Sequence, residues 1–426
     1  MTGHVNSDQD SQPNHLPLKA ETSDRMTEQT PTPTPHQNRP RVLSGMRPTG
    51  RLHLGNYMGA LYNWVQMQHQ YECYFFVADY HALTTDYADT SELQNNIREV
   101  LLDFLAGGLD PKLCTIFIQS YVPAHFELND LLGMITPVTW LERVPTYKDQ
   151  QEQLKEKDLA TFGFLGYPLL QSADILAYQP AYVPVGQDQA AHVEITREIA
   201  RRFNHLYPGE FCLADDAAPW EMEAVKTKAR KLAGDAKKES FNPHELFQAA
   251  QQAKLKSTFS VTQILPEPQV MLTPSPKLPG TDGRKMSKSY KNTILLSDPE
   301  PAVRAKLKTM VTDPERVRRT DKGNPDVCPV FDLHKVFSTE ETQQKAREGC
   351  TTAGIGCIEC KGWVADAIVK ELAPIQDRRR HYESNPAEVD AILEAGNARA
   401  NERANQTMTE VRAAMGLRAA VQGRTR

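Results

Sequence analysis

The sequence predicts an α/β fold, a doubly wound parallel sheet followed by a mostly helical C-terminal domain. Short apolar runs alternate with segments of helical periodicity in the first half of the chain, which is the pattern of βαβ units. The 426 residues are enough for two or three domains at roughly 100–200 residues each. Ligands of such sheets bind beyond the carboxyl ends of the strands, so functional residues are expected there.

Four apolar runs predict the strands. The first run, Arg41-Val42-Leu43-Ser44, ends at a turn rich in Gly, Pro and Thr, and a helix is expected from about His53 to Gln70. Further along, apolar residues recur at helical spacing from Leu93 to Leu105. The predicted strands are residues 41–44, 73–79, 113–118 and 182–186, and another helix is predicted over residues 190–203.

Changes in composition divide the chain. Residues 1–40 hold six prolines and no Phe, Tyr or Trp, so they predict a disordered tail that cannot offset its ordering entropy. A catalytic domain is predicted over residues 41–302, and a mostly helical domain over residues 303–426. An insertion at about residues 215–260 has six Lys/Arg and one acid between Lys226 and Lys238. It is either a solvated helical insertion or a basic arm that faces RNA.

Charge and hydropathy exclude several classes of protein. Lys+Arg 49 against Asp+Glu 54 gives a net charge of −5, which excludes a globally basic nucleic-acid coat but not a local basic face. A membrane span is excluded because no run of about 18 apolar residues occurs. The seven cysteines are too few for a disulfide scaffold, and their odd number fits the reducing cytoplasm.

A glycine-containing segment, residues 48–59, follows the first predicted strand and opens the first predicted helix; we call it the glycine turn. Free N–H groups at a helix start attract phosphate oxygens. Gly55 and Gly59 lie four residues apart on one helical face, where a flat adenine could approach the backbone. His53 and Asn56 offer donors to a phosphoryl group. Close packing of helix on sheet explains the glycines equally well.

A cationic segment, residues 283–289, follows more than 200 residues later; we call it the lysine loop. It reads Gly-Arg-Lys-Met-Ser-Lys-Ser, so Lys285 and Lys288 can place two ammonium groups on one polyphosphate. Such charges neutralise a pyrophosphate leaving group as it develops. The alternative, a basic surface loop, does not explain this order of residues after a nucleotide-type turn.

The two segments together resemble the class I aminoacyl-tRNA synthetases. Residues 53–56 are similar to the HIGH signature of that class, and residues 285–289 match its KMSKS signature. Other blocks, in the same order, resemble the tryptophanyl-tRNA synthetases: Ser44-Gly45-Met46-Arg47-Pro48-Thr49-Gly50, Phe117-Ile118-Gln119-Ser120, Ser172-Ala173-Asp174-Ile175-Leu176 and Val183-Pro184-Val185-Gly186-Gln187-Asp188-Gln189. The resemblance runs from about Val42 to Leu417, without the insertion.

The resemblance implies a Rossmann catalytic domain, a helical domain on the anticodon side, a homodimer, and ATP with Mg²⁺. It implies that His53, Asn56, Lys285 and Lys288 contribute most to catalysis. Arg47 stands where the family usually has Gln, and Gln171 where it often has Met. The implied ATP-binding residues are Arg47, Pro48, Thr49, Gly55, Asn56, Gly186, Gln187, Asp188, Val270, Lys285, Met286, Ser287, Lys288 and Ser289.

Asp174 lies in an otherwise apolar stretch, so its carboxylate needs a donor if it is buried. The indole ring has one N–H donor and no acceptor, and an acceptor-only carboxylate matches it. By the resemblance, Asp174 receives the indole N–H of tryptophan. The alternatives are a helix cap or salt bridge at Asp174, and a tyrosyl enzyme, since a phenol also needs polar partners.

The implied activity is that of a tryptophan–tRNA ligase. L-tryptophan reacts with ATP to give tryptophanyl-adenylate and pyrophosphate, and the tryptophanyl group then passes to the 3′-terminal adenosine of tRNA(Trp). Catalysis of this kind depends on positioning and charge stabilisation and needs no protein nucleophile. The alternative from another class is a synthetase-like paralogue that binds RNA or nucleotide without charging tRNA.

Four cysteines are clustered in the C-terminal half, with the spacing C-x21-C-x6-C-x2-C. Both tetrahedral zinc and an iron–sulfur cluster accept four thiolates, so spacing alone does not decide between them. A subset of bacterial tryptophanyl synthetases has a similar pattern that holds a [4Fe–4S] cluster, and the resemblance therefore favours that cluster over zinc or free thiols. The predicted ligands are Cys328, Cys350, Cys357 and Cys360.

Basic residues recur along the last predicted helices. They are interpreted either as a solvated surface or as contacts to tRNA phosphates, which would make the affinity depend on salt. The residues concerned are Arg378, Arg379, Arg380, His381, Arg399, Arg403 and Arg412.

Overall fold

The computed structural model describes residues 39–144, 147, 159–186, 189–274 and 276–417. Apart from residues 39 and 40, the predicted tail of residues 1–40 lies outside the described residues, as do Gln187 and Asp188. Among the described helices, none is long and apolar enough to cross a membrane.

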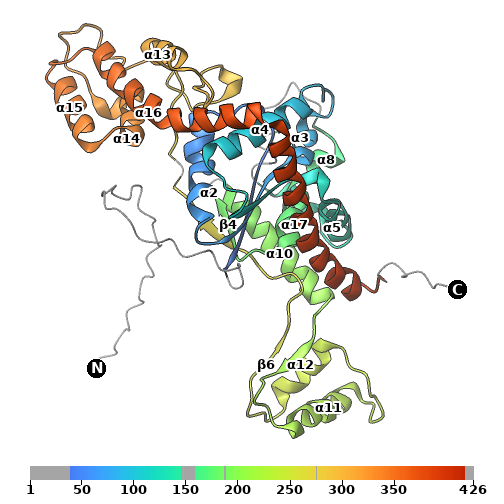
Figure 1. The fold of residues 1–426 in the computed structure, drawn as a ribbon. Coiled ribbons are helices and arrows are strands. Elements are labelled where there is room, and N and C mark those ends of the chain that lie inside the picture. Colours follow the sequence, from blue (N-terminus) through green and yellow to red (C-terminus); the bar gives the residue numbers. More distant parts are fainter. Residues whose placement is uncertain (1–38, 145–146, 148–158, 187–188, 275, 418–426) are drawn as a thin grey trace, which may run out of the picture. The chain divides into compact units, whose positions relative to one another are not determined.

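A five-stranded sheet, parallel throughout, forms the centre of the protein (Figure 1). The strand order is β3-β2-β1-β4-β7, so the chain winds outward on one side of β1 and then returns to the other side. This confirms the predicted doubly wound fold and places its switch point between β1 and β4. The strands are β1 Arg41–Met46, β2 Glu72–Val77, β3 Cys114–Ile118, β4 Tyr182–Val185 and β7 Gln269–Leu272.

Side chains alternate between the two faces of the sheet, as the pleat requires. Val42 and Phe75 join one apolar cluster, while Leu43 and Phe76 join the other. On the first face Trp64 stacks on Phe75 with ring centroids 4.8 Å apart. Because the strands are buried on both faces, they read in the sequence as continuous apolar runs rather than as alternating ones.

The helices of the catalytic part confirm the predicted periodic segments at 53–70, 93–105 and 190–203. The first of these is not a uniform α-helix, since a π-helical turn, η1 Tyr57–Leu61, interrupts it. The others are α1 Leu54–Asn56, α2 Tyr62–Met67, α3 Asp79–Asp86, α4 Leu93–Gly107, η2 Gln119–Tyr121, α5 Ala124–Gly133, α6 Val138–Glu142, α8 Phe162–Leu165, α9 Tyr167–Tyr178 and α10 Ala190–Leu206.

The segment predicted as an insertion forms a small unit with its own apolar cluster, which includes Val225 and Ala249. It contains helices α11 Pro219–Ala233 and α12 Pro243–Gln252. Two short strands that the sequence did not predict, β5 Phe211–Leu213 and β6 Phe259–Val261, come before and after these helices and pair with each other antiparallel.

The chain beyond Ala302 is helical, as predicted, and its last helix returns to the sheet. A Cβ atom at Gly396 would lie 1.8 Å from the Ile116 carbonyl oxygen, so only glycine permits this approach to the edge strand β3. Asn397 Oδ1 accepts a hydrogen bond from Ile118 N at 3.1 Å. The C-terminal elements are η4 Lys288–Tyr290, α13 Glu300–Thr309, η5 Pro325–Val327, α14 Pro329–Phe337, α15 Glu340–Thr351, α16 Cys357–Ser384 and α17 Pro386–Ala414.

Three arginines of α17 bind back onto the catalytic elements. Arg399 donates to the Pro111 carbonyl oxygen at 3.2 Å, Arg403 donates to Gln179, and Arg412 Nε donates to Glu127 at 2.6 Å. These contacts give the three arginines a structural role, while Arg399 is still exposed, and a contact with tRNA stays a prediction. The sequence shows that these residues are charged, but it does not show which carbonyl and carboxylate groups of distant segments they bind.

Candidate functional site

A cavity of about 380 Å³ opens at the switch point of the sheet. It lies where ligands of doubly wound sheets bind, beyond the carboxyl ends of β1 and β4. Small residues from β1 and η1 give it depth, and Asp174 and His81 provide polar groups at one end. The lining includes Ser44, Gly45, Arg47, Gly59, Ala60, His81, Gln171, Asp174, Gly186 and Thr273.

The glycine turn begins the first helix with a reciprocal cap. His53 Nδ1 accepts from Asn56 N at 3.2 Å, and Asn56 Oδ1 accepts from His53 N at 3.2 Å. Because Nδ1 is an acceptor here, the ring proton of neutral His53 is on Nε2. The π-helical turn that follows brings Gly59 and Ala60 to the cavity wall, and such turns are common at functional sites.

His53 is a neutral donor. Burial lowers its pKa to about 4, and the charges of Lys288 and Lys285 lower it in the same direction. At pH 7 the ring therefore presents an Nε2–H to a ligand and adds no charge to the site.

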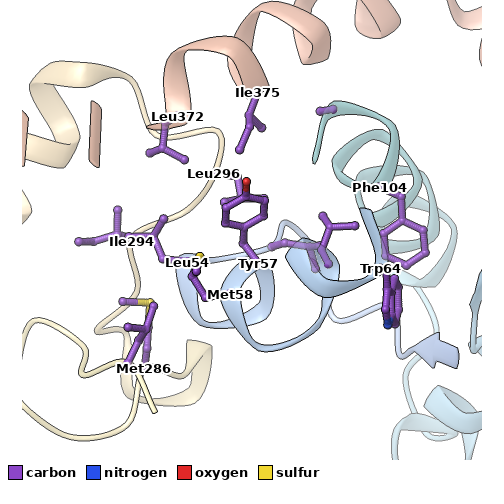
Figure 2. Packing of buried hydrophobic residues seen from close by; sticks show 14 of the residues in the cluster. Leu54, Tyr57, Met58, Trp64, Phe104, Met286, Ile294, Leu296, Leu372 and Ile375 are labelled. Atoms are coloured by element: carbon purple, nitrogen blue, oxygen red, sulfur yellow. The ribbon is translucent and has the colours of Figure 1, made fainter. Parts of the chain in front are cut away.

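The lysine loop lies against the glycine turn although more than 200 residues separate them (Figure 2). Leu54 N donates to the Ile294 carbonyl oxygen at 2.9 Å, and Leu296 N donates to the Leu52 carbonyl oxygen at 2.9 Å. Met286 is buried in the same cluster as Leu54, so its side chain anchors the loop. The two segments predicted to share one nucleotide are thus adjacent in space.

Lys288 faces the start of the glycine turn. Its Nζ donates to the carbonyl oxygens of Thr49 and Gly50, each at 2.8 Å. Asn292 stabilises the conformation of the lysine loop. Its Oδ1 accepts a hydrogen bond from Ser287 N at 2.8 Å, and its Nδ2 donates to the Lys285 carbonyl oxygen at 3.2 Å. A phosphate bound here would compete with two neutral carbonyls for the ammonium group.

Burial lowers the pKa of Lys288 to about 8, against an opposing effect of Asp103. Lys288 is therefore charged below pH 8 and loses its charge as the pH rises through that value. We expect kcat/KM for ATP to fall above about pH 8, since this parameter reports the free protein. Lys288→Arg should move the decline to higher pH because a guanidinium stays protonated. An identical profile in that variant would contradict the assignment.

Arg47 lies beside the cavity at the end of β1. Its Nη2 donates to Thr85 Oγ1 and, at 3.2 Å, to Asp86 Oδ2, while burial lowers its pKa. Gln171, the other departure from the resembled family, also lines the cavity. Both residues therefore contribute to the shape and polarity of the site.

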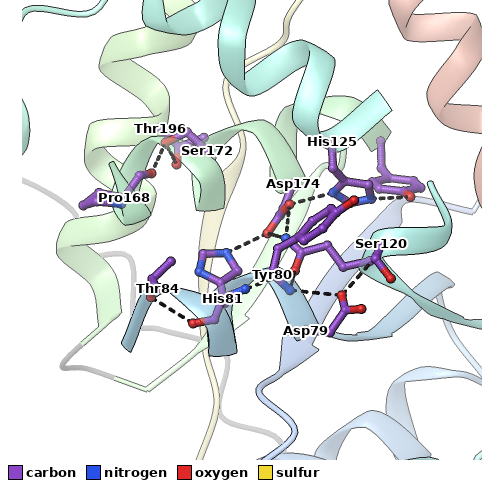
Figure 3. A network of polar contacts seen from close by, with 12 residues as sticks. Asp79, Tyr80, His81, Thr84, Ser120, His125, Pro168, Ser172, Asp174 and Thr196 are labelled. Atoms are coloured by element: carbon purple, nitrogen blue, oxygen red, sulfur yellow. Dashed lines mark hydrogen bonds and ion pairs between the residues drawn. The ribbon is translucent and has the colours of Figure 1, made fainter. Parts of the chain in front are cut away.

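Asp174 is buried on α9 at the centre of a polar network (Figure 3). Gln119 Nε2 donates to both carboxylate oxygens at 2.8 and 2.9 Å. His125 Nδ1 lies 2.6 Å from Oδ1, and His81 Nε2 lies 2.8 Å from Oδ2. The other ring nitrogen of His125 is 2.9 Å from the Tyr178 hydroxyl, which positions the ring from behind.

The Asp174 carboxylate is ionised. Burial alone would raise its pKa, but His125 and His81 outweigh burial and hold the pKa at about 2. Of its three donors, His81 is the one that lines the cavity. A ligand N–H that enters from the cavity meets a fixed negative charge there.

His81, Gln119 and His125 were not predicted as site residues from the sequence. His81 and Gln119 follow the carboxyl ends of β2 and β3 within a few residues. The rule that ligands bind at these ends could have selected them.

Comparison with known proteins gives the family. The family described as tRNA synthetases class I (W and Y) matches residues 35–219 and 239–373. A tryptophan–tRNA ligase of Ralstonia nicotianae is 50% identical over 396 residues, covering 88% of this chain and 98% of the relative. The chain belongs to the tryptophanyl-tRNA synthetase family.

Further relatives of this family agree. A tryptophan–tRNA ligase of Thermotoga maritima is 45% identical over 379 residues, covering 88% of this chain and 99% of the relative. The crystal structure of tryptophanyl-tRNA synthetase from Campylobacter jejuni complexed with ADP and tryptophan superposes with a TM-score of 0.69. It is 28% identical and covers 88% of this chain and 100% of that one.

The four clustered cysteines of this synthetase come together where α14, α15 and α16 meet. Burial raises the Cys360 pKa to about 12, and the charges of Cys328, Cys350 and Cys357 raise it further in that order, so all four thiols are within electrostatic reach. Among the described residues, however, no group of three or more His, Cys, Asp or Glu has an arrangement that could hold a metal ion. Thiolates are the ligands that thiophilic metal centres prefer.

Proposed function

We propose that the chain activates L-tryptophan with ATP and transfers it to tRNA(Trp). The observation that carries this proposal is an ionised, buried Asp174 in the wall of a cavity at the switch point, whose wall also includes Gly59 at the end of the glycine turn. The lysine loop lies against the start of the same turn through Lys288 and Thr49, so an indole donor and a triphosphate would be held on either side of this turn. The tryptophan–tRNA ligases among the relatives support the same activity.

Adenylate formation follows from this arrangement. The tryptophan carboxylate attacks the α-phosphorus of ATP, a P–O bond forms, and the bond to the pyrophosphate oxygen breaks. Lys285 and Lys288 balance the charge that grows on the leaving pyrophosphate, which Mg²⁺ accompanies. Neutral His53 donates its Nε2–H to a phosphoryl oxygen, and Asn56 keeps the ring in that tautomer. Acyl transfer to the terminal ribose of tRNA then releases AMP.

The remaining ATP contacts surround the adenine and ribose. We assign Gly55, Gly59 and Ala60 of the first helix to one side of the nucleotide, and Gly186 and Val270 to the other. Arg47, Pro48 and Thr49, which join β1 to that helix, belong to the same proposed site, and Met286 anchors the lysine loop in the core. The proposed ATP site also includes Gln187, Asp188, Ser287 and Ser289.

Tryptophan rather than tyrosine is the proposed amino acid. Asp174 accepts the indole N–H on the same carboxylate oxygen that is bonded to His81. A carboxylate can only accept, and so it matches a ligand group that can only donate. The phenol of tyrosine can also donate to this carboxylate, so the choice of tryptophan is supported mainly by the relatives, which are tryptophan–tRNA ligases.

Amino-acid-dependent ATP–pyrophosphate exchange tests this function. We expect exchange with L-tryptophan and almost none with L-tyrosine, followed by charging of tRNA(Trp). Exchange that prefers tyrosine would establish the tyrosyl alternative. Absence of exchange with both amino acids would leave the non-charging, nucleotide-binding alternative.

A metal centre at Cys328, Cys350, Cys357 and Cys360 is part of the proposal, with [4Fe–4S] preferred over zinc. It would supply local folding energy, since a bound metal orders the segments that ligate it. Two cationic or donor groups lie against the thiols and would stabilise a negatively charged cluster: Arg316 Nη1 is 3.6 Å from Cys350 Sγ, and His334 Nε2 is 3.3 Å from Cys360 Sγ.

Replacing a single ligand tests the metal centre. In Cys357→Ser we expect loss of visible iron–sulfur absorbance, weaker tRNA charging, and unchanged tryptophan-dependent exchange. Cys212→Ser is the matched control, because Cys212 lies on β5, far along the chain from the cluster, and should keep the absorbance. If wild-type protein purified without oxygen is colourless and holds one zinc ion, the centre is a zinc site and not an iron–sulfur cluster.

A homodimer is proposed from the family resemblance, and exposed apolar side chains support it. Five large ones occur on successive elements between η2 and α8, where a second subunit could cover them: Tyr121, Phe126, Met134, Val138 and Phe162. Size determination by light scattering tests this assembly.

A cytoplasmic location agrees with seven free thiols. The domain boundary near residue 302 stays a prediction, since α17 packs on the sheet.

A further inference from the structure

A buried arginine of helix α16 is linked, through side chains of α4, to the residues directly before the helix cap at His53. Arg379 is 3% exposed. Its Nη1 lies 2.5 Å from Asp103 Oδ1, its Nη2 lies 2.5 Å from Glu99 Oε2, and its Nε donates to Glu383 at 2.8 Å. Asp103 is fully buried. One guanidinium from the C-terminal region thus holds two carboxylates of α4 in the catalytic domain.

The same two carboxylates hold the residues directly before His53. Asp103 Oδ2 accepts from Leu52 N at 2.6 Å, and Glu99 Oε2 accepts from Arg51 Nε at 2.8 Å. Glu99 and Asp103 are four residues apart on α4 and so lie on one face of the helix, where a single guanidinium group can bind both carboxylates. The position of the turn is therefore set by acceptors that Arg379 fixes.

Helix α16 also contacts the segment that follows the lysine loop. Gln376 Nε2 donates to the carbonyl oxygens of Leu296 and Asp298 at 3.2 and 2.9 Å, and Tyr57 OH donates to Glu371 at 2.9 Å. Apolar side chains complete the contact in Figure 2, where Leu372 and Ile375 of α16 lie near Leu296 and Tyr57. Both ATP segments are thus held by one helix, whose first turn carries Cys357 and Cys360.

We propose that Arg379 is a positioning residue for adenylate formation, acting through Asp103 on the glycine turn and on Lys288. This inference rests on the proposed function. Burial raises the pKa of Asp103 and Arg379 opposes that effect, so without Arg379 the buried carboxylate would need another cation, and its field already acts on Lys288. The Lys288 ammonium would then be drawn to Asp103 and away from the ATP phosphates, and Leu52 N–H would lose a fixed acceptor. The tryptophan end of the cavity, around Asp174, has none of these contacts.

The test is steady-state exchange by Arg379→Met, with melting temperature measured in parallel. We expect KM for ATP to rise on the order of tenfold, with KM for tryptophan nearly unchanged. Adding Asp103→Asn should recover most of the ATP defect, because the amide removes the uncompensated charge while its oxygen still accepts from Leu52 N–H. If the higher KM for ATP in Arg379→Met came instead from a cavity or a loosened helix, adding Asp103→Asn would raise that KM further.

Arg380→Met is the matched control, since Arg380 is one residue away on the same helix and pairs at the surface with Asp377. It should leave both KM values unchanged. An unaltered KM for ATP in Arg379→Met, an equal rise in both KM values, or no recovery in the double variant would each overturn the inference. Failure of wild-type protein to catalyse exchange would instead overturn the proposed function. If Arg379→Met does not fold, the folded double variant with wild-type KM values supports the inference, and one with a raised KM for ATP overturns it.

Discussion

Asp174→Asn should abolish most tryptophan activation. The carboxylate is the acceptor for Gln119, His125 and His81, and an amide can present only one oxygen to these donors. Its NH₂ group would face a donor, so the network must rearrange and the indole N–H would lose its charged acceptor. We expect kcat/KM for tryptophan to fall by about 10³-fold or more, as for sites that lose a buried polar match. The measurement is ATP–pyrophosphate exchange at varied tryptophan.

Asp79→Asn provides the matched control in the same layer of the structure. Asp79 Oδ1 accepts from Tyr80 N and Ser120 N, each at 3.0 Å, and an amide oxygen can accept both bonds (Figure 3). This variant should keep kcat/KM for tryptophan within a few fold. Similar losses in both variants would mean that any neutralised carboxylate disrupts the pocket, and Asp174 would lose its assigned role.

Lys288→Met should slow adenylate formation by about 10²- to 10³-fold, the usual cost of removing one group that stabilises transition-state charge. The variant keeps the length of the side chain, so the loop should remain anchored by Met286 and Asn292. Because Lys288 does not line the cavity that Asp174 lines, tryptophan affinity should be unchanged. Single-turnover formation of tryptophanyl-adenylate measures the first effect, and equilibrium binding of tryptophan measures the second.

Lys291→Asn is the control for a lysine just after the lysine loop. Lys291 is exposed and has a positive φ of 53°, a conformation that asparagine tolerates well. Rates near wild type are expected. An equal loss in both variants would indicate that the total charge of the loop matters rather than the ammonium that faces Thr49 and Gly50.

The fold was predictable because its strands are buried on both faces. Runs such as Cys73–Val77 and Cys114–Ile118 are apolar apart from Thr115, and they pair in parallel as expected. Strand β7 was missed because Gln269–Leu272 is short and its side chains are exposed or only half-buried. The π-helical turn at Tyr57–Leu61 was also missed, since its residues have ordinary helical periodicity.

The site was predictable only where one short segment carries several functional residues. His53 and Asn56 share a cap, and Lys285 and Lys288 share a loop, so their spacing alone is informative. The partners of Asp174 come from three separate elements, and Arg379 lies 276 residues from Asp103. No local pattern marks a contact that exists only after the chain has folded.

The approach of Gly396 to the Ile116 carbonyl has a consequence for synthesis on the ribosome. Strand β3 is at the border of the sheet, and its outer side is covered by a helix that is made long after the strand itself. Until α17 leaves the exit tunnel, the nascent sheet has an open border, which can pair with other chains. A chain that stops before residue 386 would expose this border permanently and should be a substrate for chaperones and proteases.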